Sequence, residues 1–326
     1  MISNQTCPVA LIVCTRNRVG EITGLLGCLQ EMAIVPNRII VVDSSERLMA
    51  NEVRALCESA SNLEVTYIHS LYGAPHQKNV GLDHLAKLDF AETELVAFLD
   101  DDIVPNEKYF EKLISLFKGN SEVFCFGGFD RKLTRPKVTK LRQALGLDSE
   151  KINVLLPNAL SVAHIPLEEV VICDWVPGGM QNFRVEAVEE NRFDGTIRIH
   201  GDEVEFQLRL QSKGFGKIAT SSLLAVDHMA AQSGKTNFRS STGYLDGFRW
   251  RLAKEYPKRF SKAAVVRSTI LLAMGEALLW ASRGRKSGLF AFMGHVDFLV
   301  RVLLGKETLE RVSHAGSGPY TKAKND

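Results

Sequence analysis

The stretch LVAFLDDDIVP, residues 95–105, decides the fold class that we expect for this chain. Its opening run LVAFL is apolar throughout, which is typical of a short strand buried on both faces. The run leads directly into the adjacent carboxylates of Asp100, Asp101 and Asp102. Because like charges repel one another beside an apolar strand, we expect a hard divalent cation to compensate them. A solvated acidic turn is the alternative, which the preceding apolar run disfavours.

Outward from this strand, the first half of the chain alternates apolar runs with helical patterns. We expect strands at 9–14, 38–42, 63–68 and 95–99, and helices at 21–32, 49–60 and 77–88. This alternation predicts a parallel sheet covered by helices. The strand ends carry polar groups: Thr15-Arg16-Asn17, Asp43-Ser44-Ser45 and the Asp triplet. Since ligands bind beyond the carboxyl ends of such strands, these groups predict a binding site at one edge of the sheet.

The second half of the chain is less regular before residue 240 and helical after it. We expect a strand at 123–126, an irregular stretch at 131–170, and strand-like pieces in 172–185 and 215–228 around a helix at 203–213. Further helices are expected at 244–256, 263–281 and 289–304. The apolar stretch at 270–281 contains Glu276 and is too short to span a bilayer. Basic residues flank these helices, so two interpretations stay open: helices packed on the main domain, or an interfacial patch on an anionic membrane surface.

Composition restricts the class of protein. A chain of 326 residues with 45% hydrophobic and 24% charged residues is expected to be globular. The formal net charge of +2 argues against a nucleic-acid binder. The 6 cysteines are widely spaced with no CxxC pair, which favours buried reduced thiols. The N-terminal apolar run has no basic segment before it and predicts a strand instead of a signal peptide, so we expect the cytosol.

Several segments together resemble one known family. LVAFLDDDIVP is similar to the DXD segment of family 2 glycosyltransferases with the GT-A fold. The other matching segments are VALIVCTRNR (9–18), IIVVDSSE (39–46), GAPHQKNVGLDHL (73–85), WVPGGMQNFRVEA (175–187) and FDG…GDEVEFQLRLQSKGF (193–215). The resemblance covers about residues 7–260. It implies an α/β fold with a Rossmann-like mixed sheet, helices on both faces, and a C-terminal helical extension.

The resemblance also implies a domain order. Residues 1–240 would form the GT-A domain, with a nucleotide-binding half at 1–105 and an acceptor half at 106–240. Residues 241–312 would form the helical region, which packs on the domain or associates with a membrane, and 313–326 a flexible tail.

The resemblance assigns a binding site for the nucleotide sugar. The residues expected there are Thr15, Arg16, Asn17, Asp43, Lys78, Asn79, Asp100, Asp101 and, in a later loop, Lys235. Asp43 would accept a hydrogen bond from the base or the ribose. For Arg16 and Lys78, exposed cations without a ligand are an equal alternative. Mn²⁺ or Mg²⁺ would bind Asp102 and His228, although a histidine that only caps a strand end stays open for His228. Along an extended path, Asp100 and Asp102 would point to one side and Asp101 to the other.

The same resemblance places the chemistry at residues 201–206. Glu203 aligns with the family's catalytic base, and Asp202 is the second candidate because the order of the acidic pair is swapped here. An inverting transfer needs such a carboxylate to take the proton of the acceptor hydroxyl. A helix N-terminus enriched in acids is the alternative. Trp175, Gly178 and Gly179 would shape the acceptor side, with Trp175 partly in the core.

These expectations define one function and two alternatives. The function is a metal-dependent inverting glycosyltransferase that uses a nucleotide-diphosphate sugar. Its acceptor would be a glycan, free or lipid-linked, in cell-surface polysaccharide or glycoconjugate biosynthesis. The alternatives are a nucleotidyltransferase acting on sugar phosphates and a non-catalytic nucleotide-sugar-binding module. The expected location is the cytoplasm, with peripheral attachment to the inner face of the cell membrane as a further expectation, and no nucleic-acid partner.

Overall fold

The computed structural model describes residues 5–132, 138–197, 200–229 and 238–306. The strands are β1 (Gln5–Thr15), β2 (Ile34–Asp43), β3 (Val65–His69), β4 (Leu95–Asp100), β5 (Ile103–Pro105), β6 (Val123–Asp130), β7 (Val154–Leu155), β8 (Ser161–Val162), β9 (Val171–Cys173), β10 (Met180–Arg184) and β11 (Lys217–His228). The helices are α1 (Val19–Glu31), α2 (Arg47–Ser59), α3 (Ala74–Lys87), α4 (Tyr109–Gly119), α5 (Lys140–Ala144), α6 (Val185–Val188), α7 (Asp202–Ser212), α8 (Phe238–Glu255), α9 (Lys262–Arg283) and α10 (Lys286–Leu303).

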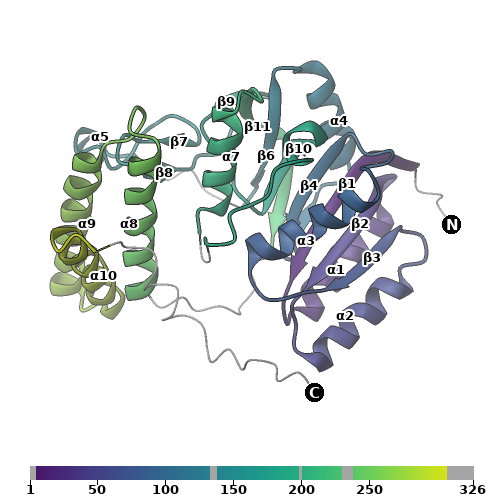
Figure 1. Ribbon diagram of the computed structural model, residues 1–326, viewed down its shortest axis with the longest axis horizontal. Helices are drawn as coiled ribbons and strands as arrows, with labels where there is room; N and C mark the ends of the chain where they lie inside the picture. The colour runs from purple at the N-terminus through teal and green to yellow at the C-terminus, as the bar shows by residue number, and fades with distance from the viewer. Residues whose placement is uncertain (1–4, 133–137, 198–199, 230–237, 307–326) are drawn as a thin grey trace. The chain divides into compact units, whose positions relative to one another are not determined.

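A mixed sheet organises the first part of the chain (Figure 1). Within the described residues it has nine strands in the order β3-β2-β1-β4-β10-β6-β11-β5, with β9 paired to β11. Strands β1 to β4 are parallel, as the alternation of strands and helices predicts. Cys14 pairs with Asp100 and Thr15 with Asp43, so β1, β2 and β4 end level with one another. The register therefore confirms that three strand ends bring polar residues to one edge.

Two apolar layers hold helices on both faces of the sheet. Alternate residues of β1 supply them: Leu11 packs in the layer with α1, α2 and α4, whereas Ile12 packs in the layer with α3, α6 and α7. This two-sided burial explains why the first strand is apolar without interruption. The six cysteines are all free and lie in the described part of the chain, four of them buried, as their sequence context predicts.

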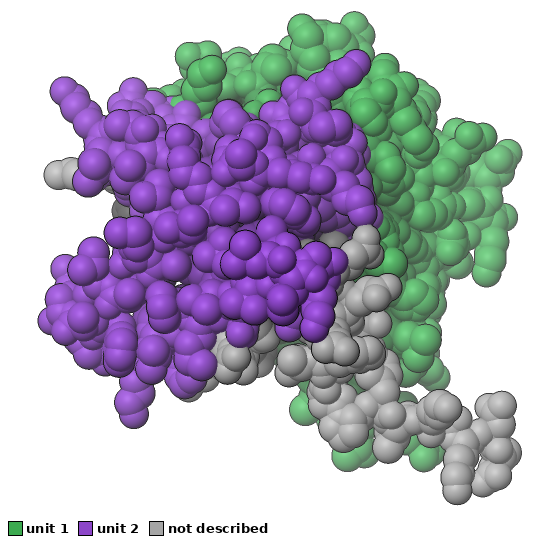
Figure 2. All heavy atoms as spheres, turned by 60° about the vertical axis from the view of Figure 1, so that its left-hand side comes forward, with its two compact units in different colours: residues 1–137, 151–154, 163–232 green, residues 138–150, 155–162, 233–326 purple. Residues whose placement is uncertain are grey.

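The chain divides into two compact units (Figure 2). The first comprises residues 1–137, 151–154 and 163–232 and contains the sheet. The second comprises residues 138–150, 155–162 and 233–326 and contains α5 and the helices α8, α9 and α10. The stretch 131–170, expected to be irregular, thus includes the short elements α5, β7 and β8.

A buried polar network joins the helices of the second unit. His295 Nδ1 on α10 lies 2.6 Å from Asp246 Oδ2 on α8. Arg249 Nη1 donates to Asp246 Oδ1 at 2.8 Å, and Arg249 also donates to the hydroxyl of Ser268 on α9. The side chains of Asp246, Arg249 and His295 are all buried. Each of these three buried side chains therefore has a polar partner where water does not reach it.

The helices expected in residues 244–304 are confirmed, and they are longer than expected. The apolar stretch 270–281 belongs to α9, which has 22 residues. The most apolar 18-residue window of this helix has a mean hydropathy of 1.5. By length and composition, the whole helix could cross a membrane. The expectation that this region is too short to span a bilayer holds for residues 270–281 alone and is wrong for the helix that contains them. Only 22% of that window is buried in the protein.

Candidate active site

The acidic triplet lies where β4 ends and the chain turns toward β5. Thr15 Oγ1 donates to Asp101 Oδ2 at 2.7 Å. Arg18 Nη1 lies 2.8 Å from Asp101 Oδ1 and 3.4 Å from Asp102 Oδ2. The expected alternation of the three carboxylates is therefore wrong, because the strand stops at Asp100 and one guanidinium contacts both following residues. Burial raises the pKa of Asp101 to about 6, although the hydrogen bonds from Thr15 and Arg18 lower it.

His228 reaches the triplet from the end of β11. Strand β11 pairs with β5, with His228 opposite Ile103, and the Met229 N–H donates to the Asp102 carbonyl at 2.8 Å. This pairing places His228 Nε2 3.3 Å from Asp102 Oδ1. The two residues expected to bind a metal thus meet at the edge of the sheet, although they are 126 positions apart in the sequence.

Asp102 and His228 fit a divalent ion by the chemistry of their donors, a carboxylate oxygen beside an imidazole nitrogen. Among the described residues, no cluster of three or more His, Cys, Asp or Glu side chains could hold a metal. Of the described residues, Asp102 and His228 would then be the two ligands, with phosphate oxygens and water beside them, as is usual for Mg²⁺ and Mn²⁺ with nucleotides.

Two glycines connect the triplet to the second acidic cluster. A Cβ at Gly179 would lie 2.2 Å from Asp100 Oδ2, and a Cβ at Gly178 would lie 3.2 Å from Glu203 Cβ. The Asp100 N–H also donates to the Gly179 carbonyl at 3.0 Å. The Gly178-Gly179 segment thus runs directly between Asp100 and Glu203. A side chain at Gly179 would displace the Asp100 carboxylate, which explains the residue type at this position.

A buried ion pair supports the second cluster. Lys78 Nζ on α3 lies 2.7 Å from Asp202 Oδ2 at the start of α7, and the two side chains are 8% and 10% exposed. Burial would lower the pKa of Lys78, but the charges of Asp202 and Glu203 raise it above its ordinary value. Burial would raise the pKa of Asp202, but the Lys78 charge and hydrogen bond lower it. Both groups therefore stay charged near neutral pH.

Glu203 behaves in the opposite way to its neighbour. Burial and then the charge of Asp202 raise the pKa of Glu203 to about 7, with Lys78 opposing the shift. The Gly201 N–H donates to Glu203 Oε2 at 3.2 Å. A carboxylate with a pKa near neutrality can accept a proton and release it again during a reaction. Asp202 and Glu203 thus have different electrostatic surroundings. The helix dipole, which acts on both residues, does not by itself explain this difference.

The nucleotide-side candidates lie on the same edge of the sheet. Asp43 is buried, and its Oδ1 accepts from the Ser45 N–H at 2.8 Å and from the Ser45 hydroxyl, while Tyr67 donates to Oδ2 at 2.9 Å. The Asn17 N–H donates to Ser45 Oγ at 2.7 Å. These bonds tie the ends of β1, β2 and β3 into one rigid edge. The role of Asp43 toward a base or ribose stays a prediction.

Other predicted residues already have partners inside the protein. Asn79 holds the backbone of Phe193 through two hydrogen bonds, of 2.9 and 2.8 Å. The Arg16 guanidinium lies 4.1 Å from the centre of the Tyr72 ring. Trp175 is 8% exposed and belongs largely to the core, the alternative considered for it. Lys235 lies outside the described residues. The ligand roles of these residues stay predictions.

Arg18 was not among the predicted site residues. Its guanidinium forms an ion pair with Asp101, although Arg16 was the arginine selected from the sequence. The signal was present in the sequence TRNR at residues 15–18, where the second arginine follows the strand by three positions. Arg18 begins α1 as its N-cap residue, which brings its side chain back over the strand ends.

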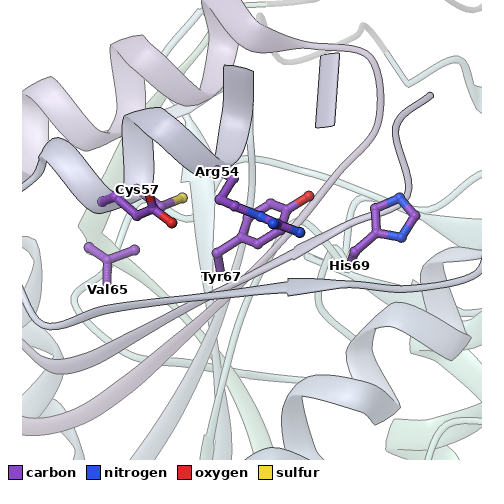
Figure 3. A pocket seen from close by; sticks show the side chains of 6 residues that line it. Arg54, Cys57, Val65, Tyr67 and His69 are labelled. Atoms are coloured by element: carbon purple, nitrogen blue, oxygen red, sulfur yellow. The ribbon is translucent and has the colours of Figure 1, made fainter. Parts of the chain in front are cut away.

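A pocket of about 370 Å³ lies between α2 and β3 (Figure 3). Arg54 and Cys57 extend from the helix, and Val65, Tyr67 and His69 from the strand. Its Tyr67 connects it to the strand-end cluster through the hydrogen bond to Asp43. None of its lining residues was predicted as part of the site.

Comparison with known families agrees with this geometry. The family Glycosyl transferase family 2 matches residues 10–164, nearly half of the chain, including the acidic triplet and Lys78. These residues are similar to the domain of family 2 glycosyltransferases, which supports a glycosyltransferase activity for the protein. No curated protein sequence matches the chain.

Solved structures confirm the fold. A mannosyltransferase, PcManGT from Pyrobaculum calidifontis in complex with GDP-Man and Mn²⁺, has 17% identity and a TM-score of 0.56, with 92% of this chain and 88% of that chain covered. GalNAc-T7 with UDP, GalNAc and Mn²⁺ has 11% identity and a TM-score of 0.55, with 93% and 58% covered. The chain thus has the predicted GT-A fold with a mixed sheet.

Proposed function

We propose that the protein transfers a sugar from a nucleotide-diphosphate sugar to an acceptor hydroxyl with inversion, in a reaction that requires a divalent cation. The observation that carries this proposal is the Gly178-Gly179 segment, which lies against Asp100 on one side and Glu203 on the other. A sugar bound beside this segment would have the acidic triplet near its diphosphate and Glu203 near its anomeric carbon. This is the arrangement that a displacement at an anomeric carbon needs.

Glu203 is the proposed base. It takes the proton of the acceptor hydroxyl while the hydroxyl oxygen bonds to the anomeric carbon from the face opposite the diphosphate. The bond from that carbon to the diphosphate oxygen breaks, and its electron pair leaves with the diphosphate. The raised pKa of Glu203, about 7, suits this transfer, whereas Lys78 holds Asp202 as an ionised partner. This contrast supports Glu203 over Asp202.

The leaving group is the proposed partner of the triplet. Asp102 and His228 would hold Mn²⁺ or Mg²⁺, which when bound neutralises charge that develops on the diphosphate. Thr15 orients Asp101 through its hydroxyl, and Arg18 offsets part of the negative charge of Asp101 and Asp102. The nucleoside would lie over the ends of β1 and β2, near Asp43. The bound GDP-Man and UDP of the two similar structures support a nucleotide-diphosphate sugar as donor.

The proposed acceptor is a glycan, free or lipid-linked, in the synthesis of a cell-surface polysaccharide or glycoconjugate on the cytoplasmic side of the membrane. The apolar and basic helices after residue 240 support a lipid-linked acceptor, because such an acceptor is held at a membrane surface.

Donor screening tests the proposal. The purified chain is incubated with UDP, GDP and dTDP sugars, with Mn²⁺ or with a chelator, and release of the nucleoside diphosphate is measured together with the melting temperature. We expect one class of donor to raise the melting temperature and to be cleaved only with the metal. Absence of metal-dependent release and of stabilisation with every donor would overturn the transferase proposal.

The same assay separates the two alternatives. A nucleotidyltransferase would form pyrophosphate from a nucleoside triphosphate and a sugar phosphate. A non-catalytic module would be stabilised by a nucleotide sugar without cleaving it. An anomeric configuration of the product equal to that of the donor, measured by NMR, would exclude inversion.

A further inference from the structure

The turn between α9 and α10 forms a compact tip, defined here as residues 278–290. Helix α9 ends at Arg283, Gly284 has a left-handed φ of 61°, and α10 starts at Lys286. A Cβ at Gly288 would lie 2.9 Å from the Glu276 carbonyl oxygen, so the backbones of the two helices touch beside the turn. The tip is therefore a closely packed helical hairpin and not a loose loop.

The tip exposes large apolar side chains. Leu278 is 68% exposed, Trp280 43% and Phe290 46%. At a rise of about 1.5 Å per residue, these side chains lie within roughly 10 Å of the turn along the helix axes. Apolar side chains gathered at one end of a hairpin are unusual for a surface that contacts only water.

The same tip carries cations and lacks acids. Arg283, Arg285 and Lys286 are exposed, and the sequence from 278 to 290 contains no Asp or Glu. The surrounding helices add to this positive charge, because residues 241–306 hold 12 of the chain's 40 Lys and Arg but only 4 of its 38 Asp and Glu. A partner that fits this tip therefore combines negative charge with an apolar interior.

We infer that the α9–α10 tip docks on the surface of an anionic lipid bilayer. Trp280, Leu278 and Phe290 enter the boundary between headgroups and acyl chains, where aromatic side chains are enriched. Arg283, Arg285 and Lys286 pair with the lipid phosphates. The inference does not rest on the transferase reaction, because the tip lies within the second unit and its residues have no part in the chemistry.

Peripheral docking fits α9 better than crossing the bilayer, although its length and hydropathy would permit crossing. Glu276 lies in the second half of the helix, and Val265, Ser268 and Ala273 of the same helix are buried in the protein. Ser268 also accepts a hydrogen bond from Arg249. A crossing helix would have to leave these contacts.

Vesicle binding of the full chain tests this inference. The probes are vesicles of phosphatidylcholine alone and of phosphatidylcholine with phosphatidylglycerol, and bound protein is measured by co-sedimentation. We expect binding to the anionic vesicles only. The triple variant R283Q/R285Q/K286Q is expected to bind roughly a hundredfold more weakly, since each cation near an anionic surface contributes about a fivefold effect. Leu278→Ser combined with Trp280→Ala is expected to weaken binding at least tenfold.

Matched controls keep the test specific. The variant K87Q/K108Q/K118Q removes three exposed cations of the first unit, and Leu167→Ser removes an apolar side chain that is 73% exposed. Both are expected to bind like the native chain, and melting temperatures verify that every variant folds.

Four outcomes would overturn the inference. The first two are equal binding to neutral vesicles and equal losses of binding in the control variants. The third is retention in the membrane after an alkaline carbonate wash, which would indicate a spanning helix. The fourth is a dimer in light scattering that only the tip variants abolish. The last result would assign the tip to a second copy of the chain. Loss of vesicle binding with nucleotide-sugar cleavage intact would leave the proposed function untouched.

Discussion

Lys78 Nζ and Asp202 Oδ2 lie 2.7 Å apart in the core of the first unit, and the pair fixes the start of α7 against α3. Lys78 keeps Asp202 ionised, whereas burial and the charge of Asp202 raise the pKa of the adjacent Glu203 to about 7. Of these two carboxylates, Glu203 is therefore the one whose protonation can change near neutral pH. This difference supports the roles proposed for the swapped acidic pair, in which Asp202 is a structural partner and Glu203 takes the proton.

Replacing Glu203 by Gln should stop turnover and spare donor binding. The amide keeps the size of the side chain but cannot take the acceptor proton, so kcat is expected to fall about 10²- to 10⁴-fold. Calorimetry should give an unchanged affinity for the donor with Mn²⁺. The control Glu190→Gln changes an exposed glutamate outside the site and should keep full activity. A Glu203→Gln enzyme with more than a tenth of native turnover would refute the assignment.

Replacing Asp202 by Asn should destabilise the fold. The change leaves the buried Lys78 ammonium without its counter-charge, and breaking a buried pair in this way costs about 3–5 kcal/mol. Denaturant unfolding measures the loss. In a double-mutant cycle, Lys78→Met should recover part of it, because both charges are then absent. Strictly additive losses would show that the pair is not coupled.

The rate should depend on the ionisation of Glu203. As the base, Glu203 is active when deprotonated, and its pKa is raised to about 7. Turnover at saturating donor and acceptor is therefore expected to be low in acid, to rise as the pH increases through about 7, and to level off above it. The residual rate of the Glu203→Gln variant should not show this rise with pH. A native rate that is flat between pH 6 and 8, in the range set by this pKa, would contradict the role.

Adding one methyl group at Gly179 should impair the site more than the fold. A Cβ there would lie 2.2 Å from Asp100 Oδ2, so the carboxylate must move while the backbone stays. We expect Gly179→Ala to lower kcat/KM roughly 10- to 100-fold, because misplacement by about 1 Å has effects of this size. Gly195→Ala is the control, since its Cβ would meet nothing within 4 Å. Equal activity of the two variants would contradict the proposed position of Asp100.

Removing Arg18 should strengthen metal binding in the absence of donor. Its guanidinium neutralises part of the charge of Asp101 and Asp102, so Arg18→Met leaves a more negative site. The affinity for Mn²⁺, titrated by electron paramagnetic resonance, is expected to rise about tenfold at low ionic strength. Arg47→Met removes an exposed cation elsewhere and should change nothing. Weaker Mn²⁺ binding in Arg18→Met would mean that Arg18 holds the acids in the geometry that binds the metal.

The parts of the fold that local sequence determines were predictable. Strands β1, β2 and β4 place apolar residues in both layers of the core and end in polar residues, so both their existence and their shared edge follow from the sequence. The family resemblance predicted that Asp102 and His228 lie at one site, and the two side chains are in contact in the structure.

The parts that depend on contacts between distant segments were not predictable. The path of the chain after Arg16 determines that Arg18, and not Arg16, reaches the acidic triplet. Lys78 and Asp202 are 124 residues apart, and nothing in either local sequence indicates that one neutralises the other. The alternation expected for the triplet failed because a turn begins where the strand was assumed to continue.

The network of Asp246, Arg249 and His295 has a consequence for how the protein can be shortened. A chain that stops after α8 would lose His295 and Ser268 and leave the buried Asp246 and Arg249 side chains partly unsatisfied. Removing α9 and α10 would therefore damage the helix that remains. The last two helices are thus not a detachable anchor, and point substitutions on their surface are the way to separate attachment from folding.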